Sequence, residues 1–144
     1  MTTPNAWFFW ALLSAIFAAL SAIFAKVGIE KIDSDLATLI RTLIVLVVLS
    51  LFVALAGKWR NPLVLAPKTW VFLGLSALAT GASWVCYFRA LQRGNAFQVA
   101  PVDKLSLVLV AIFAVIFLGE RPTPRDWFGI TLVACGVLTL ALKK

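Results

Sequence analysis

The chain has 144 residues, of which 62% are hydrophobic and 13% charged, with a mean hydropathy of +1.01 and a formal net charge of +7. A soluble domain carries about 25% charged residues, and a chain this short cannot enclose so much apolar surface in one core. The composition therefore excludes an ordinary soluble domain and predicts a multi-pass protein of the lipid bilayer.

Two classes of function are also excluded by the residue types. The lysines and arginines flank apolar segments instead of covering a polar surface, so anionic lipid headgroups are the expected counter-charge and no nucleic acid partner is expected. The chain has no histidine, and Cys86 and Cys135 belong to no metal-binding or disulfide motif. We therefore expect no metal, no other cofactor and no enzymatic activity.

Five apolar segments are long enough to cross a bilayer, which requires about 20 residues in a helix. In chain order they cover about residues 6–25, 36–56, 69–91, 97–118 and 126–142. The sequence predicts an all-α membrane protein, a bundle of five transmembrane helices that forms a single domain over residues 1–144.

Short polar motifs mark where these segments begin and end. Asp33 precedes the second segment as a helix cap, Pro67 precedes the third, and Gly94 or Asn95 follows the third in a position suited to a left-handed turn. Before the last segment, Thr123 is placed to cap the helix while Asp126, three residues on, returns the hydrogen bond.

The start of the fourth segment has two interpretations. If the helix begins at Ala96, Asp103 lies about 10 Å along its axis, where a charge in lipid is costly and indicates function. If Pro101 is the first helical residue, the proline sacrifices no hydrogen bond and Asp103 lies in the first turn, where the helix dipole favours an anion. The second interpretation makes Asp103 a structural residue.

Aromatic and basic residues report on how the chain crosses the membrane. In an up-and-down path five tryptophans fall on one membrane face, as in an aromatic belt: Trp7, Trp10, Trp59, Trp70 and Trp127. Trp84 instead lies in the middle of a segment. The basic residues other than Lys104 divide five against seven between the two faces, a bias small enough to permit insertion in both orientations.

Two stretches carry a resemblance to a known family. "FAKVGIEKIDSDLATLIRTLIVLVVL" resembles the first two helices of an EamA-type domain of the drug/metabolite transporter superfamily, and "FRALQRGNAFQVAPVDKLSLVLVAIFAVIFLGERPTPRDWFGITLVACGVLTL" resembles its last part. The shared features are a short turn between two spans, a proline early in the fourth helix, "LGE" at its end and a last helix with spaced glycines.

The resemblance implies a fold, a location and an assembly. Most members of the superfamily are similar to two such domains fused with opposite orientations, whereas this chain resembles one half, as in the five-helix bacterial and archaeal transporter group. It implies a homodimer, with an antiparallel pair of dual topology favoured, in the cytoplasmic (inner) membrane of a bacterium or archaeon. The first span lacks the glutamate of the small multidrug resistance proteins, so their proton-coupled mechanism does not transfer.

Charged and aromatic residues near one membrane level form the predicted binding site. We expect a cationic cluster around one carboxylate, lining a cavity for a small polar or zwitterionic substrate, with one member of the Asp103–Lys104 pair serving a partner helix because adjacent helical residues point about 100° apart. The predicted substrate-binding residues are Asp103, Lys104, Arg41, Arg89, Trp84, Tyr87 and Phe88. An equal alternative is a salt-bridge network that holds helix ends together, and Glu120 is expected to orient the following loop.

The sequence leaves two functions to compare, a transporter and a non-transporting membrane subunit. The main hypothesis is a secondary transporter, an exporter of small metabolites as the resemblance implies. The alternative is a non-transporting membrane subunit or modulator that pairs with a different chain.

Overall fold

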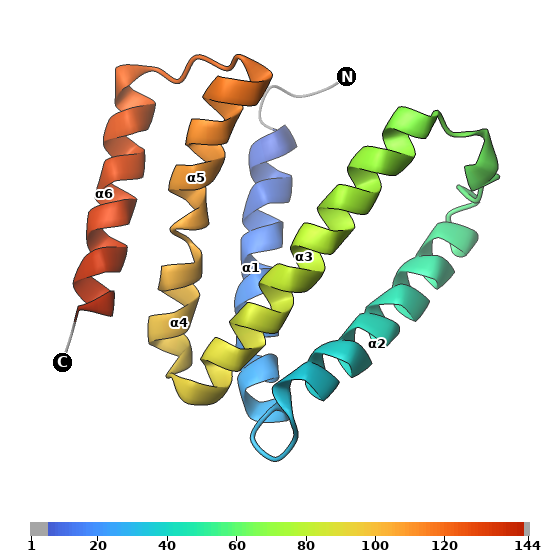
Figure 1. Ribbon diagram of the computed structural model, residues 1–144, viewed down its shortest axis with the longest axis horizontal. Helices are drawn as coiled ribbons and strands as arrows, with labels where there is room; N and C mark the ends of the chain where they lie inside the picture. Colours follow the sequence, from blue (N-terminus) through green and yellow to red (C-terminus); the bar gives the residue numbers. More distant parts are fainter. Residues whose placement is uncertain (1–5, 143–144) are drawn as a thin grey trace. The chain divides into compact units, whose positions relative to one another are not determined.

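The computed structural model describes residues 6–142, except for the side chain of Leu63, and over this range it contains helices and no strand. The elements are α1 (Ala6–Gly28), α2 (Ser34–Leu55), the 3-10 turn η1 (Pro62–Val64), α3 (Pro67–Arg93), α4 (Ala96–Asp103), α5 (Ser106–Phe113), the π-helical segment η2 (Ala114–Leu118) and α6 (Pro124–Ala141) (Figure 1). The all-α prediction is confirmed for the described residues.

Four stretches have the length and composition of a membrane span. They are α1, α2, α3 and the continuous stretch Ala96–Leu118 of 23 residues, which comprises α4, α5 and η2. Helix α6 has only 18 residues and its first turn contains Arg125 and Asp126, so its apolar part is shorter. The protein is a multi-pass membrane protein, and the fifth span remains a prediction.

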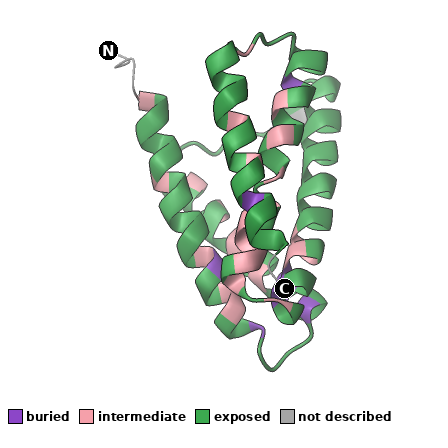
Figure 2. Cartoon of the chain, turned by 90° about the vertical axis from the view of Figure 1, so that its left-hand side faces the viewer, coloured by how far each residue is buried: buried purple, intermediate pink, exposed green. Residues whose placement is uncertain are grey.

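The chain divides into two compact units, Met1–Arg93 and Gly94–Lys144. In the first unit α3 packs against both α1 and α2. Most of the chain is exposed (Figure 2), and the buried residues of the first unit gather where α1 ends, α2 begins and α3 ends. These buried residues are Ala22, Ile29, Ser34, Ala37, Thr38, Phe88 and Leu91.

Polar side chains hold this end of the first unit together. Asp33 caps α2, accepting from the backbone amides of Asp35 at 2.9 Å and Leu36 at 3.2 Å. Lys26 donates from Nζ to the Leu91 carbonyl at 2.6 Å, and Gln92 donates from Nε2 to the Ile32 carbonyl. Carbonyls near helix ends lack intrahelical partners, so such donors anchor the α3 end to its neighbours.

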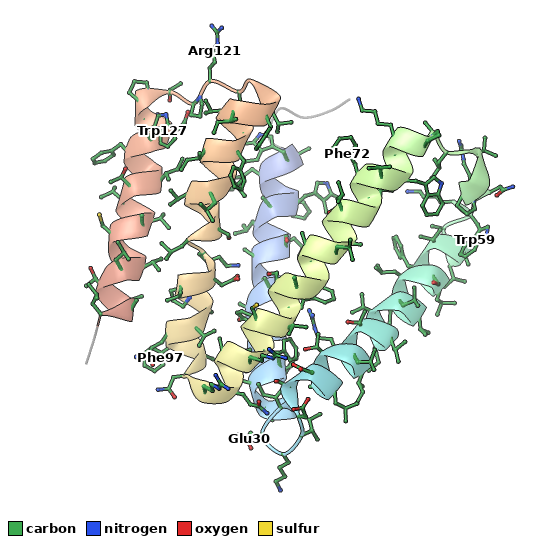
Figure 3. All side chains as sticks on the ribbon, viewed as in Figure 1. Glu30, Trp59, Phe72, Phe97, Arg121 and Trp127 are labelled. Carbon is green, nitrogen blue, oxygen red and sulfur yellow. The ribbon has the colours of Figure 1, made fainter. Side chains whose placement is uncertain are left out.

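The opposite end of the first unit carries exposed tryptophans. Trp7 and Trp10 begin α1, Trp59 follows α2, and Trp70 in the first turn of α3 donates from its indole N–H to the Pro62 carbonyl at 3.2 Å. Figure 3 shows Trp59 beside the η1 turn. Their exposure and common end agree with an interfacial belt, whereas Trp84 is half-buried within α3.

In the second unit α6 packs antiparallel to α4 and α5 (Figure 1). Gly119 ends η2 with a left-handed φ of 67°, a conformation that glycine adopts without steric cost. Thr123 caps α6, and the Oδ2 atom of Asp126 accepts from the Thr123 amide at 2.7 Å. The predicted capping box is therefore confirmed.

The fourth span begins at Ala96, so the interpretation that places Pro101 at the first helical position is wrong. Asn95 has extended backbone angles and its carbonyl accepts from the amides of Gln98 and Val99, so the helix is already formed before the proline. An interior proline removes a backbone hydrogen bond and costs about 3 kcal/mol, and the rejected interpretation rests on that cost.

The helix responds to Pro101 by breaking within the following turn. The Lys104 amide donates to the Pro101 carbonyl at 2.9 Å and the Leu105 amide to the Val102 carbonyl at 3.0 Å, a 3-10 pattern in place of the α-helical one. Helix α4 therefore ends at Asp103 and α5 begins at Ser106. Asp103 lies at a break inside the span and not in a first helical turn.

Candidate functional site

Arg41 is the centre of the polar groups inside the first unit. Its Cζ atom lies 4.4 Å from the centroid of the Trp84 ring and 5.6 Å from that of Phe88. Its Nη2 atom donates to the Ser21 hydroxyl on α1 at 3.2 Å. The Arg41 guanidinium therefore joins all three helices of the unit, and a cation held over aromatic faces is stabilised by about 0.5–2 kcal/mol.

Local sequence spacing explains this arrangement. Trp84 and Phe88 are four residues apart on α3 and so share one face, the face that packs toward α2. Arg41 lies seven residues after Ser34, about 10 Å along the α2 axis from its start. The guanidinium is thus half-buried at a depth where α2 crosses apolar surroundings.

A groove of about 600 Å³ opens beside Arg41 between α1 and α2. Its polar side chains are those of Arg41 and Ser21, and Phe88 of α3 contributes to its lining. The other lining residues are apolar: Phe17, Leu20, Phe24, Ala25, Gly28, Ile29, Ile32, Ala37, Ile40, Ile44 and Val45. A hollow of this size is in the range of small-molecule sites, about 300–1,000 Å³.

Arg89 pairs with an acid that sequence reasoning did not select. Its Nε and Nη2 atoms donate to Asp35 Oδ1 at 2.9 Å and Oδ2 at 2.6 Å, a bidentate pair in which both side chains are about half exposed. The pair ties the end of α3 to the first turn of α2. Asp35 is not among the predicted site residues.

Tyr87 lies beside the aromatic face that supports Arg41. Its ring packs edge-on against Phe88, with ring centroids 6.4 Å apart. In the first unit the structure thus brings together Arg41, Trp84 and Phe88, with Tyr87 beside Phe88, and it pairs Arg89 with Asp35.

Asp103 and Lys104 belong to the second unit and contact each other. The Lys104 Nζ atom lies 3.3 Å from Asp103 Oδ2. Lys104 follows the last residue of α4, and its long side chain reaches back to Asp103. That one of the two residues serves a partner helix stays a prediction.

A second hollow, of about 410 Å³, lies in the second unit between α5 and α6. Glu120, Arg121 and Asp126 line it together with apolar residues of both helices. The Glu120 amide donates to the Ala114 carbonyl at 3.2 Å, directly after the left-handed Gly119. Arg121 extends away from the helices at the loop (Figure 3).

Neither a metal centre nor a disulfide is formed by the described residues. Within residues 6–142 no three His, Cys, Asp or Glu side chains come together as metal ligands. Cys86 and Cys135 are free and exposed.

Comparisons with known proteins agree with the helical pattern. The model of the EamA-like transporter family matches residues 5–142. An uncharacterized transporter of a Sinorhizobium species is 57% identical over 138 residues, which cover 96% of this chain and 98% of the relative. An uncharacterized protein of Methanocaldococcus jannaschii is 28% identical over 133 residues, covering 92% of this chain and 94% of that protein.

A third relative has a more specific name. The probable 4-amino-4-deoxy-L-arabinose-phosphoundecaprenol flippase subunit ArnE of Yersinia pestis is 27% identical over 70 residues, 49% of this chain and 61% of that protein. No solved structure matches the chain. The match over nearly the whole chain and the Sinorhizobium relative show that this membrane protein belongs to the EamA-like transporter family.

Proposed function

We propose that the protein is a secondary transporter that exports a small polar or zwitterionic metabolite. The observation that carries this proposal is the environment of Arg41. Within the described part of the first unit its contacts are with the Trp84 and Phe88 rings and the Ser21 hydroxyl, and none is with a carboxylate. A half-buried guanidinium that has no carboxylate partner can bind the carboxylate or phosphate of a solute through two parallel hydrogen bonds.

Asp103 is proposed as a second charged binding residue, with Lys104 as its neighbour. Helix α4 begins at Ala96, so Asp103 lies about 10 Å along the axis from the start of its own span. Broken helices with free backbone groups at mid-membrane are a recurrent feature of transporter binding sites. In this proposal Tyr87 and Arg89 support the site, and Glu120 orients the loop before α6.

The proposed assembly is an antiparallel homodimer in the cytoplasmic membrane of a bacterium or archaeon. The nearly even division of basic residues between the two faces would let copies insert in both orientations. Inverted pairs of similar domains build many transporters, and two copies of this chain would reproduce that symmetry. The alternative, a subunit that pairs with a different chain, is favoured by the name of the ArnE relative, a flippase subunit.

Uptake by a single purified chain tests the transporter proposal. Proteoliposomes that contain only this protein are expected to exchange labelled amino-acid-like zwitterions across the membrane faster than empty vesicles. Exchange would support a homomeric transporter. Failure of every solute in a broad panel, together with recovery when a second chain is added, would instead establish the heteromeric subunit.

Labelling from one side of the membrane tests the antiparallel arrangement. Single cysteines at positions 3 and 144, both outside the described residues, are placed in a background that lacks Cys86 and Cys135. An impermeant thiol reagent added to intact cells is expected to label about half of the molecules at each position, because both orientations coexist. Labelling of one position alone would contradict the antiparallel homodimer.

A further inference from the structure

We infer that the groove between α1 and α2 binds an amphipathic anion, with the headgroup at Arg41 and an apolar chain along the groove. The inference rests on the proposed function in one respect, since it assigns the same Arg41 to recognition. It adds that the molecule recognised carries an apolar chain as well as a charged group.

The one charged side chain among the described residues that line the groove, Arg41, defines the headgroup. Arginine has five N–H donors, and within the described part of the first unit the acceptor that Arg41 engages is the Ser21 hydroxyl. A guanidinium that remains charged inside a membrane span requires a counter-charge. The Ser21 hydroxyl lies 3.2 Å from the Arg41 Nη2 atom. An anion beside Arg41 could therefore accept hydrogen bonds from both the guanidinium and the hydroxyl.

The walls of the groove define the rest of the ligand. Apart from Arg41 and Ser21, every lining residue is apolar, and together they enclose about 600 Å³. A polar solute at Arg41 contacts only the part of the groove around the guanidinium, whereas an alkyl chain attached to that solute would extend along the apolar walls. Because lipid tails are as apolar as these walls, such a chain would be held by close van der Waals packing in the groove and not by removal from water.

The groove is also open to the side from which such a molecule would enter. Phe24 on α1 and Ile44 on α2, which line it, are 70% and 59% exposed. In a membrane-spanning unit these side chains face lipid, so an amphiphile dissolved in the bilayer reaches Arg41 by moving sideways. It does not have to cross an aqueous entrance.

Quenching of Trp84 fluorescence by a brominated amphiphile tests the inference. The experiment uses the full-length protein in nanodiscs of neutral lipid, with Trp84 as its single tryptophan and phenylalanine at the other five positions: Trp7, Trp10, Trp59, Trp70 and Trp127. The probe is dodecyl phosphate with bromine close to the phosphate, compared with the uncharged dodecanol brominated at the same place. Trp84 is the reporter because its ring lies under the Arg41 guanidinium.

The phosphate is expected to quench saturably at a concentration at least about tenfold lower than the alcohol, the ratio that one or two charge-assisted hydrogen bonds produce. Arg41→Gln should remove this advantage. Arg60→Gln, a change in the exposed loop after α2, should leave it intact.

Three results would overturn the inference: equal quenching by both probes, an advantage that survives Arg41→Gln, or displacement of the probe by ethyl phosphate as effective as by unbrominated dodecyl phosphate. The last would identify a small-anion site without a chain-binding groove. Because binding is measured without transport, saturable quenching by a protein that moves no solute would contradict only the proposed transport function.

Discussion

Replacement of Arg41 by glutamine is expected to lower the rate of solute exchange in proteoliposomes by at least about tenfold. The reason is that the Arg41 guanidinium lies inside a span, over Trp84 and Phe88, with donors left for a ligand. Loss of a charge-assisted hydrogen bond costs about 1.5–3 kcal/mol, equivalent to about 10- to 150-fold in affinity. The measurement is initial exchange rate against substrate concentration, for equal amounts of folded protein.

Two further variants separate recognition from stability. Arg41→Lys keeps the charge but loses the planar fork, so an intermediate rate is expected if bidentate binding of an anion matters. Arg60→Gln removes an arginine from an exposed loop and should leave the rate unchanged. If Arg41→Gln exchanges solute at the normal rate, Arg41 is a packing residue that holds α1, α2 and α3 together, and the proposed site is wrong.

The helices were predictable because their cause is local. Long apolar segments require helices in a membrane, and the polar motifs between them fix the ends: Asp33 accepts amide protons of α2, and the Thr123–Asp126 pair closes the start of α6. Helix boundaries follow from residues within a few positions of the boundary. They therefore required no knowledge of neighbouring helices.

The break in the fourth span was not predictable in this way, although its cause is also local. The sequence left two starts open, Ala96 and Pro101, because an interior proline forfeits a backbone bond and a proline at the first helical position does not. The outcome depends on whether Asn95 starts the helix one turn earlier, and the balance between these starts is only a few kcal/mol. The structure shows that the earlier start is favoured and that the helix breaks after Asp103.

Partners of charged side chains were the hardest feature to predict. Arg41 and Arg89 were both assigned to one cluster because they lie near the same membrane level. Their different partners depend on the rotation of each helix: Arg89 meets Asp35 at the end of α3, while Arg41 points inward to Trp84. Helix rotation is set by packing across the unit, and sequence spacing within one helix does not determine it.

Replacement of Asp103 by asparagine is expected to lower solute exchange by at least about tenfold while leaving the protein as stable as before or more stable. Asp103 is the last residue of α4, where the negative end of the helix dipole opposes an anion. A carboxylate within a span is costly as well, by about 2.5–3.5 kcal/mol at a helix centre. A neutral amide of the same shape relieves both penalties, even though the contact with Lys104 is weakened.

The opposite signs of these two effects distinguish a binding role from a structural one. Thermal unfolding in detergent and exchange in proteoliposomes are measured on the same preparations of Asp103→Asn and of a control, Glu30→Gln, which removes an exposed acid from the turn after α1. The control should exchange solute normally. If Asp103 only holds the broken span together, its replacement must lower the melting temperature, and exchange will fall only as far as folded protein is lost. If the Asp103→Asn variant is as stable as the wild type but no longer exchanges solute, the wild-type carboxylate serves binding and not stability.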